Sequence, residues 1–167
     1  DDYFLLVSRL SGYKNPGLVI DAFNELGLPL TVIGTGDELP RLQSMAKPNI
    51  TFTGWLPDEE VAKYMSRCRA LVFPVEEDFG IVPVEAMAAG RPVIALKKGG
   101  ALETVIDGKT GLWVEDLAPG AFVLAINKFL EMEKKGQWDA SFIRKHAEKF
   151  GKERFKREIK KFVDSKV

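Results

Sequence analysis

The sequence predicts an α/β protein built on a doubly wound, Rossmann-like parallel sheet of six strands, with helices on both faces. Two observations lead to this fold class. Short apolar runs that suit buried strands alternate with stretches of helical period along most of the chain. Glycine, proline, asparagine or aspartate separates these runs, at spacings that leave room for one crossover helix between successive parallel strands.

The composition fits a single globular domain over residues 1–167, with a helical tail from about residue 137. Hydrophobic residues make up 46% of the chain and charged residues 29%. No apolar run approaches the length that crosses a bilayer, and the start, Asp1-Asp2-Tyr3, suggests a chain that begins within a longer protein. The lone Cys68 cannot form an internal disulfide, favours a reducing compartment, and suits a small core position.

The first half of the chain contains three predicted strands and three predicted helices. Asn15 followed by Pro16 suits an N-cap and the first position of a helix, which Gly27 would end. Pro57 and Asp58 suit the start of another helix. The expected strands cover 3–7, 30–33 and 49–53, and the helices cover 16–26, the stretch up to about 46, and the stretch from 58 to 68.

The second half repeats the alternation and then becomes helical. An apolar run precedes an acidic turn and a helix that ends at Gly90, and Gly99-Gly100 begins a turn before a short helix. We expect strands over 70–73, 92–96 and 111–114, helices over about 81–89 and 102–105, and two or three helices after 118.

The glycine loop Gly34-Thr35-Gly36 follows a strand and precedes a helix, as a dinucleotide fingerprint does. Leu39 stands where the third glycine of that fingerprint belongs, and the loop follows the second strand rather than the first. The sequence therefore disfavours a nicotinamide-binding domain. A tight turn close to a phosphate remains a reasonable interpretation.

The stretch from Glu76 to Gly90 carries the strongest chemical signal. A strand that ends at a helix N-terminus in an open α/β sheet is where phosphate-bearing ligands bind. Glu77 and Glu85, with seven residues between them, add two carboxylates that can accept hydrogen bonds from sugar hydroxyls. Spacing alone favours the simpler interpretation, in which Glu77 is an acid stabilised by the helix dipole and Glu85 is a solvated helix residue.

A resemblance gives this stretch a specific meaning. The segment EDFGIVPVEAMAAGRPVIA, followed by GGALETVIDGKTG, resembles the nucleotide-sugar-binding half of retaining glycosyltransferases of the GT-B fold, family 4 (group 1). Within that family, it most resembles the mannosyltransferases of polysaccharide and lipid-linked glycan assembly. The match runs from about residue 3 to about residue 114. It implies the C-terminal half of a GT-B fold, whose N-terminal, acceptor-binding domain is absent from this chain.

The same resemblance implies roles for individual residues. Arg9 and Lys14 can clamp a diphosphate, although loops carry surface cations routinely, and the resemblance favours the clamp. Glu85 would bind the ribose hydroxyls and Glu77 a hydroxyl of the transferred sugar. The turn at Gly34 and Gly36 would lie near a phosphate, and the backbone N–H groups of Phe79, Gly80 and Ile81 would face the sugar and the phosphates. The base would lie near the loop at Gly54, Trp55 and Leu56. Trp55 could otherwise pack on the edge of the core.

The implied function is donor binding in a cytoplasmic hexosyltransferase. The donor would be a nucleoside-diphosphate sugar, with GDP-mannose favoured and a UDP-sugar left open, and no cofactor or metal would be required, since the chain has no DxD pair. The acceptor, a glycan or a lipid-linked sugar, would bind the missing domain, and the full enzyme could contact the inner face of the membrane. This chain alone would be an inactive half.

Other function classes stay open at this point. One is a non-catalytic nucleotide-binding or regulatory domain, and another is a glycosidase that uses the two glutamates. The tail carries nine Lys or Arg against three Glu between Arg144 and Lys161, which suggests nucleic acid or an anionic membrane as a partner. The stripe Phe155, Ile159 and Phe162 favours an ordinary amphipathic helix with a solvated face instead. His146 lies in this tail and is expected to be remote from every motif.

Overall fold

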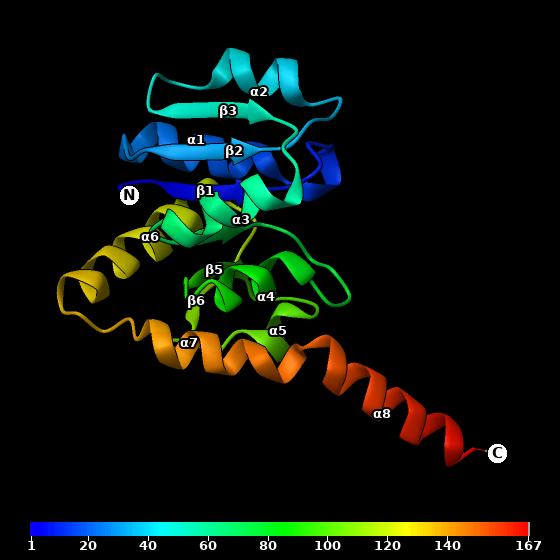
Figure 1. Ribbon diagram of the computed structural model, residues 1–167. Helices are drawn as coiled ribbons and strands as arrows, with labels where there is room; N and C mark the ends of the chain where they lie inside the picture. The colour runs from blue at the N-terminus through cyan, green and yellow to red at the C-terminus, as the bar shows by residue number, and fades with distance from the viewer. Residues whose placement is uncertain (167) are drawn as a thin grey trace.

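The computed structural model describes residues 1–166 and contains one parallel six-stranded sheet between two layers of helices (Figure 1). Each predicted strand is present, with ends that differ from the predicted ones by about one residue. The strands are β1 (Phe4–Val7), β2 (Leu30–Ile33), β3 (Ile50–Gly54), β4 (Leu71–Phe73), β5 (Val93–Leu96) and β6 (Gly111–Val114). Their spatial order is β3-β2-β1-β4-β5-β6, and all neighbours run parallel.

The predicted helices also form. They are α1 (Pro16–Leu26), α2 (Leu39–Met45), α3 (Asp58–Arg67), α4 (Ile81–Ala88), α5 (Ala101–Thr104), α6 (Pro119–Lys134), α7 (Ala140–Ala147) and α8 (Lys152–Asp164), with two short 3-10 helices, η1 (Gly12–Lys14) and η2 (Glu148–Phe150). Among the described residues, none of these helices combines the length and the apolar character that a membrane crossing requires.

The sheet separates two hydrophobic cores. Successive residues of β1 point to opposite faces, so Phe4 and Leu6 pack with α1 and α6, whereas Leu5 packs with α3, α4 and α7. Because both faces are covered, most of the strands are apolar along their length rather than alternating, as parallel strands usually are. The exceptions are Thr31 in β2, and Thr51 and Thr53 in the edge strand β3. Cys68 is fully buried in the second core, as the sequence predicted.

The strand order reverses between β1 and β4, because the chain returns from the β3 edge through α3 to the other side of β1. In open α/β sheets, ligands bind at the carboxyl ends of the strands beside such a reversal. The loops that follow β1, β2, β3 and β4 therefore meet where a binding site is expected.

One helix start differs from the prediction. Asn15 lies at the N-cap position of α1, but its side chain makes no capping hydrogen bond. Its backbone is left-handed, with φ 54°, whereas a capping residue normally has extended backbone. The Nδ2 group instead donates to the carbonyl of Pro74 at 3.0 Å, and so joins the loop after β1 to the loop after β4.

The prediction that His146 lies far from every motif was wrong. The imidazole is buried, and its Nε2–H donates to the carbonyl of Thr104, at the end of α5, at 2.8 Å. Phe150 packs edge-on against His146 and also against Phe79 in the acidic turn, with ring centroids 5.6 Å and 6.1 Å apart. The segment α7–η2 thus supports the region around the acidic turn from behind.

Only α8 projects from the body of the domain (Figure 1). No residue of this helix is buried, and the predicted apolar stripe, Phe155, Ile159 and Phe162, is exposed along with the charged face. The prediction of an amphipathic helix is confirmed, but its apolar face does not pack on the described part of the chain. The rest of the predicted tail, by contrast, belongs to the fold, since Ile143 and Ala147 of α7 lie in the second core.

Candidate functional site

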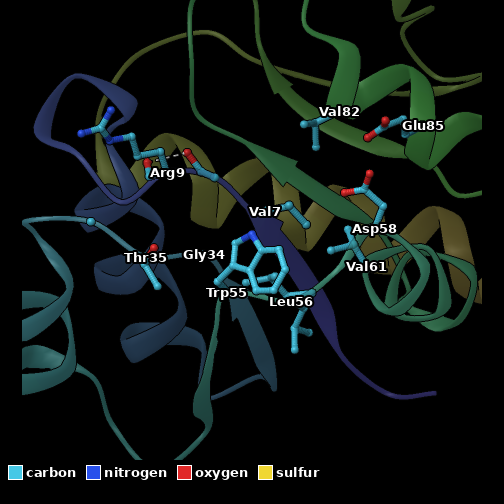
Figure 2. A pocket seen from close by; sticks show the side chains of 13 residues that line it. Val7, Arg9, Gly34, Thr35, Trp55, Leu56, Asp58, Val61, Val82 and Glu85 are labelled. Atoms are coloured by element: carbon cyan, nitrogen blue, oxygen red, sulfur yellow. Dashed lines mark hydrogen bonds between the residues drawn. The ribbon is translucent and has the colours of Figure 1, made fainter.

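A cavity of about 630 Å³ opens at the carboxyl ends of the central strands. It brings together the end of β1, the glycine loop after β2, the loop after β3, and the facing sides of α3 and α4 (Figure 2). Six of the predicted site residues line it, namely Arg9, Gly34, Gly36, Trp55, Leu56 and Glu85. Lys14, Glu77, Phe79, Gly80 and Ile81 lie outside this lining.

The floor of the cavity depends on two glycines that pack against the backbone of the loop after β1. Gly34 has φ 138°, and a Cβ atom there would lie 1.9 Å from the carbonyl oxygen of Ser8. A Cβ atom at Gly36 would lie 2.1 Å from the carbonyl oxygen of Leu10. No other residue permits this contact, so the glycine loop holds the Arg9 segment in place.

Trp55 and Arg9 occupy different parts of the rim. The Trp55 side chain is 72% exposed beside the cavity, which argues against the alternative that it packs on the edge of the core. Figure 2 shows the guanidinium of Arg9 at the opposite end of the cavity from Glu85. One end of the cavity is therefore cationic and the other anionic.

The anionic end consists of Glu85 from α4 and Asp58 from α3, whose carboxylates point toward one another (Figure 2). The pKa of Glu85 is raised above its ordinary value of 4.5, first because the cavity walls partly desolvate the carboxylate and second because Asp58 repels its charge. Within residues 1–166, the Glu85 carboxylate has neither a hydrogen-bond nor an ion-pair partner. Sequence reasoning placed Asp58 only at the start of a helix and missed its place in the cavity.

We expect Glu85→Gln to be more stable than the wild type at neutral pH. A raised pKa means that the folded state holds the proton more tightly than the unfolded state does, so wild-type stability is fully present below pH 4.5 and falls as the pH rises through the raised pKa. Glutamine cannot ionise and escapes this loss. Urea denaturation between pH 4 and 7 measures the difference, with Glu131→Gln, on an exposed position of α6, as the control. A stability difference that does not change with pH would contradict this account.

The two other charged residues predicted for the site contact each other. Lys14 Nζ, in η1, forms an ion pair with Glu77 Oε1 in the acidic turn after β4. Both side chains are largely buried, with 15% and 29% of their surfaces exposed. The structure thus brings together Lys14, which we predicted to bind the diphosphate, and Glu77, which we predicted to bind the transferred sugar.

Helix α4 begins directly after Gly80, which has φ 74°, and no side chain caps its first turn. The first N–H groups of such a helix lack intrahelical partners and carry partial positive charge. Gly80 is buried, whereas Phe79 and Ile81 on either side are 45% and 61% exposed. The N-terminus of α4 therefore offers backbone donors beside the acidic turn.

The turn Gly99-Gly100, for which we predicted no role in the site, holds the acidic turn in position. The N–H of Gly100 donates to the carbonyl of Glu77 at 2.7 Å. A Cβ atom at Gly100 would lie 2.5 Å from both the carbonyl oxygen of Asp78 and the Cα of Phe79. Two adjacent glycines after a strand were the available signal, but nothing in the sequence identified the backbone that they touch.

Comparison with known proteins places this site in a family. The family described as "Glycosyl transferases group 1" matches residues 1–157, which is nearly the whole chain. The chain belongs to the group 1 glycosyltransferases. The resemblance stated from the acidic stretch is therefore confirmed at the level of this family.

Curated relatives include two mannosyltransferases. A GDP-mannose-dependent alpha-(1-6)-phosphatidylinositol monomannoside mannosyltransferase of Mycolicibacterium smegmatis is 34% identical over 142 residues, covering 74% of this chain and 37% of that protein. An alpha-1,3/1,6-mannosyltransferase of Dictyostelium discoideum is 38% identical over 166 residues, covering 80% of this chain and 39% of that protein. This group 1 domain thus spans less than half the length of the curated relatives that it matches.

Solved structures agree with the fold. Anabaena HepE in complex with UDP-glucose superposes with a TM-score of 0.87 at 26% identity, covering 99% of this chain and 49% of that one. The sucrose-phosphate synthase of Thermosynechococcus elongatus gives the same TM-score and identity over 99% of this chain and 45% of that one. The predicted doubly wound parallel sheet is therefore the sheet of glycosyltransferase structures.

Proposed function

We propose that this chain is the donor-binding, C-terminal domain of a family 4, GT-B glycosyltransferase that transfers a hexose, mannose in particular, from a nucleoside-diphosphate sugar with retention. The observation that carries the proposal is the layout of the site: a cavity with a cationic and an anionic end lies beside an ion-paired lysine and glutamate at a helix N-terminus. The mannosyltransferase relatives and the UDP-glucose complex of HepE support it.

The parts of a nucleotide sugar fit these groups in order. Glu85 accepts hydrogen bonds from the ribose hydroxyls, since a carboxylate binds two neighbouring hydroxyls well. Trp55 and Leu56 lie beside the base. Arg9 and Lys14 bind the diphosphate, and Glu77 binds a hydroxyl of the hexose. The contact between Lys14 and Glu77 suits this order, because the hexose is bonded directly to the second phosphate.

The chemistry of transfer is largely electrostatic. As the bond between the sugar and the phosphate breaks, negative charge grows on the leaving diphosphate, and the side-chain cations and the N–H groups of Gly80 and Ile81 stabilise it. For retention, the acceptor oxygen must bond to the sugar carbon on the face that the diphosphate leaves, with the hydroxyl proton passing to the departing phosphate, in a closed cleft that excludes water. We therefore assign acceptor binding, for a glycan or a lipid-linked sugar, to a further domain of the enzyme.

Glu85→Ala tests this proposal. We expect the variant to fold and to lose most of its affinity for a nucleoside diphosphate, by roughly 1.5–3 kcal/mol, because a charge-assisted contact to the ribose is removed. Calorimetric titration with GDP, UDP and their sugars measures the loss, and Glu131→Ala is the matched control. Unchanged affinity in a folded Glu85→Ala would refute the assignment.

The same titration separates a donor domain from a regulatory nucleotide-binding domain. A donor domain should distinguish GDP-mannose or UDP-glucose from the bare diphosphate, since Glu77 and the turn after β4 contact the hexose. A regulatory domain would bind the diphosphate and its sugar alike.

A further inference from the structure

Helix α7 packs against α4, the helix that carries Glu85 (Figure 1). Ile143 of α7 is fully buried in the second core, which also contains Met87 of α4. Arg144 Nε donates at 3.2 Å to the carbonyl of Ala88, one of the last carbonyls of α4, which lack partners within the helix. A residue on α7 therefore has a defined position relative to Glu85.

His146 is the residue of α7 that reaches the turn behind Glu77. Its Nε2–H donates to the carbonyl of Thr104 at 2.8 Å. Thr104 is fully buried, and its N–H and Oγ1 both donate to the carbonyl of Gly100, each at 3.2 Å. The N–H of Gly100 in turn donates to the carbonyl of Glu77 at 2.7 Å. Hydrogen bonds thus link His146 to Glu77 residue by residue.

Aromatic contacts join the same two regions by a second route. Phe150, at the end of η2, packs edge-on against His146 and against Phe79. Phe79 lies two residues after Glu77 in the acidic turn. Both routes from α7 to the acidic turn therefore begin at His146.

Filling the core does not explain a histidine at this position. The Nδ1 atom of His146 is buried and has no hydrogen-bond partner among residues 1–166, a cost that leucine or phenylalanine would avoid. What the position requires is a donor. Thr104 ends α5, where carbonyls lack intrahelical partners, and its buried carbonyl receives the Nε2–H.

We propose that His146 is a positioning residue for the donor sugar, because its Nε2–H fixes the Gly99-Gly100 turn, and through it the acidic turn, relative to α4. The inference rests on the proposed function, in which Glu85 binds the ribose and Glu77 binds the hexose. These two glutamates lie on different segments, so their relative placement decides whether the hexose meets Glu77 once the ribose is bound. His146 does not line the cavity and acts through the backbone.

Two substitutions separate the N–H group from the ring. His146→Gln keeps an N–H donor near the place of Nε2 and loses the ring, whereas His146→Phe keeps a ring beside Phe150 and loses the donor. Calorimetric titration with GDP, GDP-mannose, UDP and UDP-glucose gives the preference of each variant for a sugar nucleotide over its bare diphosphate. Lys145→Gln, at an exposed position on the same helix, is the control.

We expect His146→Phe to lose roughly three- to tenfold of the preference for the sugar nucleotide, the range that one hydrogen bond between neutral groups carries. Its affinity for the bare diphosphate should stay as in the wild type. His146→Gln should restore most of the preference, and Lys145→Gln should keep all of it. A folded His146→Phe that keeps the preference would overturn the inference, as would a His146→Gln that fails to restore it.

The wild type offers a test that needs no variant. His146 is the only histidine in the chain, so the imidazole nitrogen resonances in NMR spectra belong to it alone. We expect Nε2 to carry the proton and its resonance to shift more with the sugar nucleotide than with the bare diphosphate. A proton on Nδ1, or a shift no larger with the sugar nucleotide, would overturn the inference even if His146→Phe failed to fold.

Failure of the proposed function can be told apart from failure of the inference. If the wild type binds the diphosphates and their sugars alike, the proposed function fails, and the inference fails with it. If the wild type prefers the sugar nucleotide and a folded His146→Phe prefers it equally, the proposed function stands and only the role of His146 is refuted.

Discussion

The double variant Arg9→Ala, Lys14→Ala should lose at least about a hundredfold in affinity for GDP while its affinity for guanosine stays nearly unchanged. A diphosphate concentrates negative charge, and each charge-assisted contact to it contributes roughly 1.5–3 kcal/mol, so two of them account for about a hundredfold or more. Loss of Lys14 also leaves the Glu77 carboxylate without its cation, which adds repulsion toward the phosphates. Calorimetric titration of both ligands measures the effect.

The control for this prediction is Arg157→Ala, Lys160→Ala, which removes the same two charges from exposed positions on α8. It should bind GDP as the wild type does. If it weakens GDP equally, net charge rather than the site explains the loss. If the double variant lost as much affinity for guanosine as for GDP, the two cations would not be binding the diphosphate.

The same titration tests whether GDP binding requires a divalent metal ion. We propose that Arg9, Lys14 and the N-terminus of α4 neutralise the diphosphate without a divalent cation, so affinity for GDP should be the same in EDTA as in magnesium or manganese. The described residues contain no cluster of three or more metal-ligating side chains. A tenfold loss in EDTA, about 1.4 kcal/mol, would show that a metal carries part of the phosphate binding.

The sheet could be predicted because its information is local. A parallel strand covered on both faces must be a short apolar run, and the crossover between two such strands must be a helix of limited length. Leu30–Ile33 and Val93–Leu96 therefore appear in the sequence much as they do in the structure. The hydrophobic pattern does not identify the family, which was predicted from the resemblance of the acidic stretch instead.

Contacts between distant segments could not be predicted in the same way. Asn15 resembles a cap in sequence, but its side chain binds Pro74, and His146 resembles a tail residue, but it binds Thr104. The place of Asp58 in the cavity could not be predicted for another reason. An acid at a helix start has a sufficient local explanation in the dipole, so only the facing carboxylate of Glu85 reveals that it belongs to the cavity.

Gly100→Ala should damage the packing behind the acidic turn. Gly100 has φ −62°, which alanine adopts without strain, so the effect comes from contact alone. The new Cβ would lie 2.5 Å from Asp78 O and from Phe79 Cα, and because both are backbone atoms, no side-chain rotation relieves the overlap. Overpacking of this kind costs about 1–3 kcal/mol of stability.

The displaced backbone is also the proposed donor site, so Gly100→Ala should weaken a nucleoside-diphosphate sugar more than the bare diphosphate. The methyl group moves the segment that carries Glu77 and Phe79, whereas Glu85 and Arg9 lie on other elements. Thermal unfolding and titration with GDP and GDP-mannose separate the two effects. Gly120→Ala is the control, because a Cβ atom there meets nothing within 4 Å and alanine in a helix gains about 0.5–1 kcal/mol over glycine. If Gly100→Ala were as stable as Gly120→Ala and kept its preference for the sugar, Gly99-Gly100 would not be the support of the acidic turn.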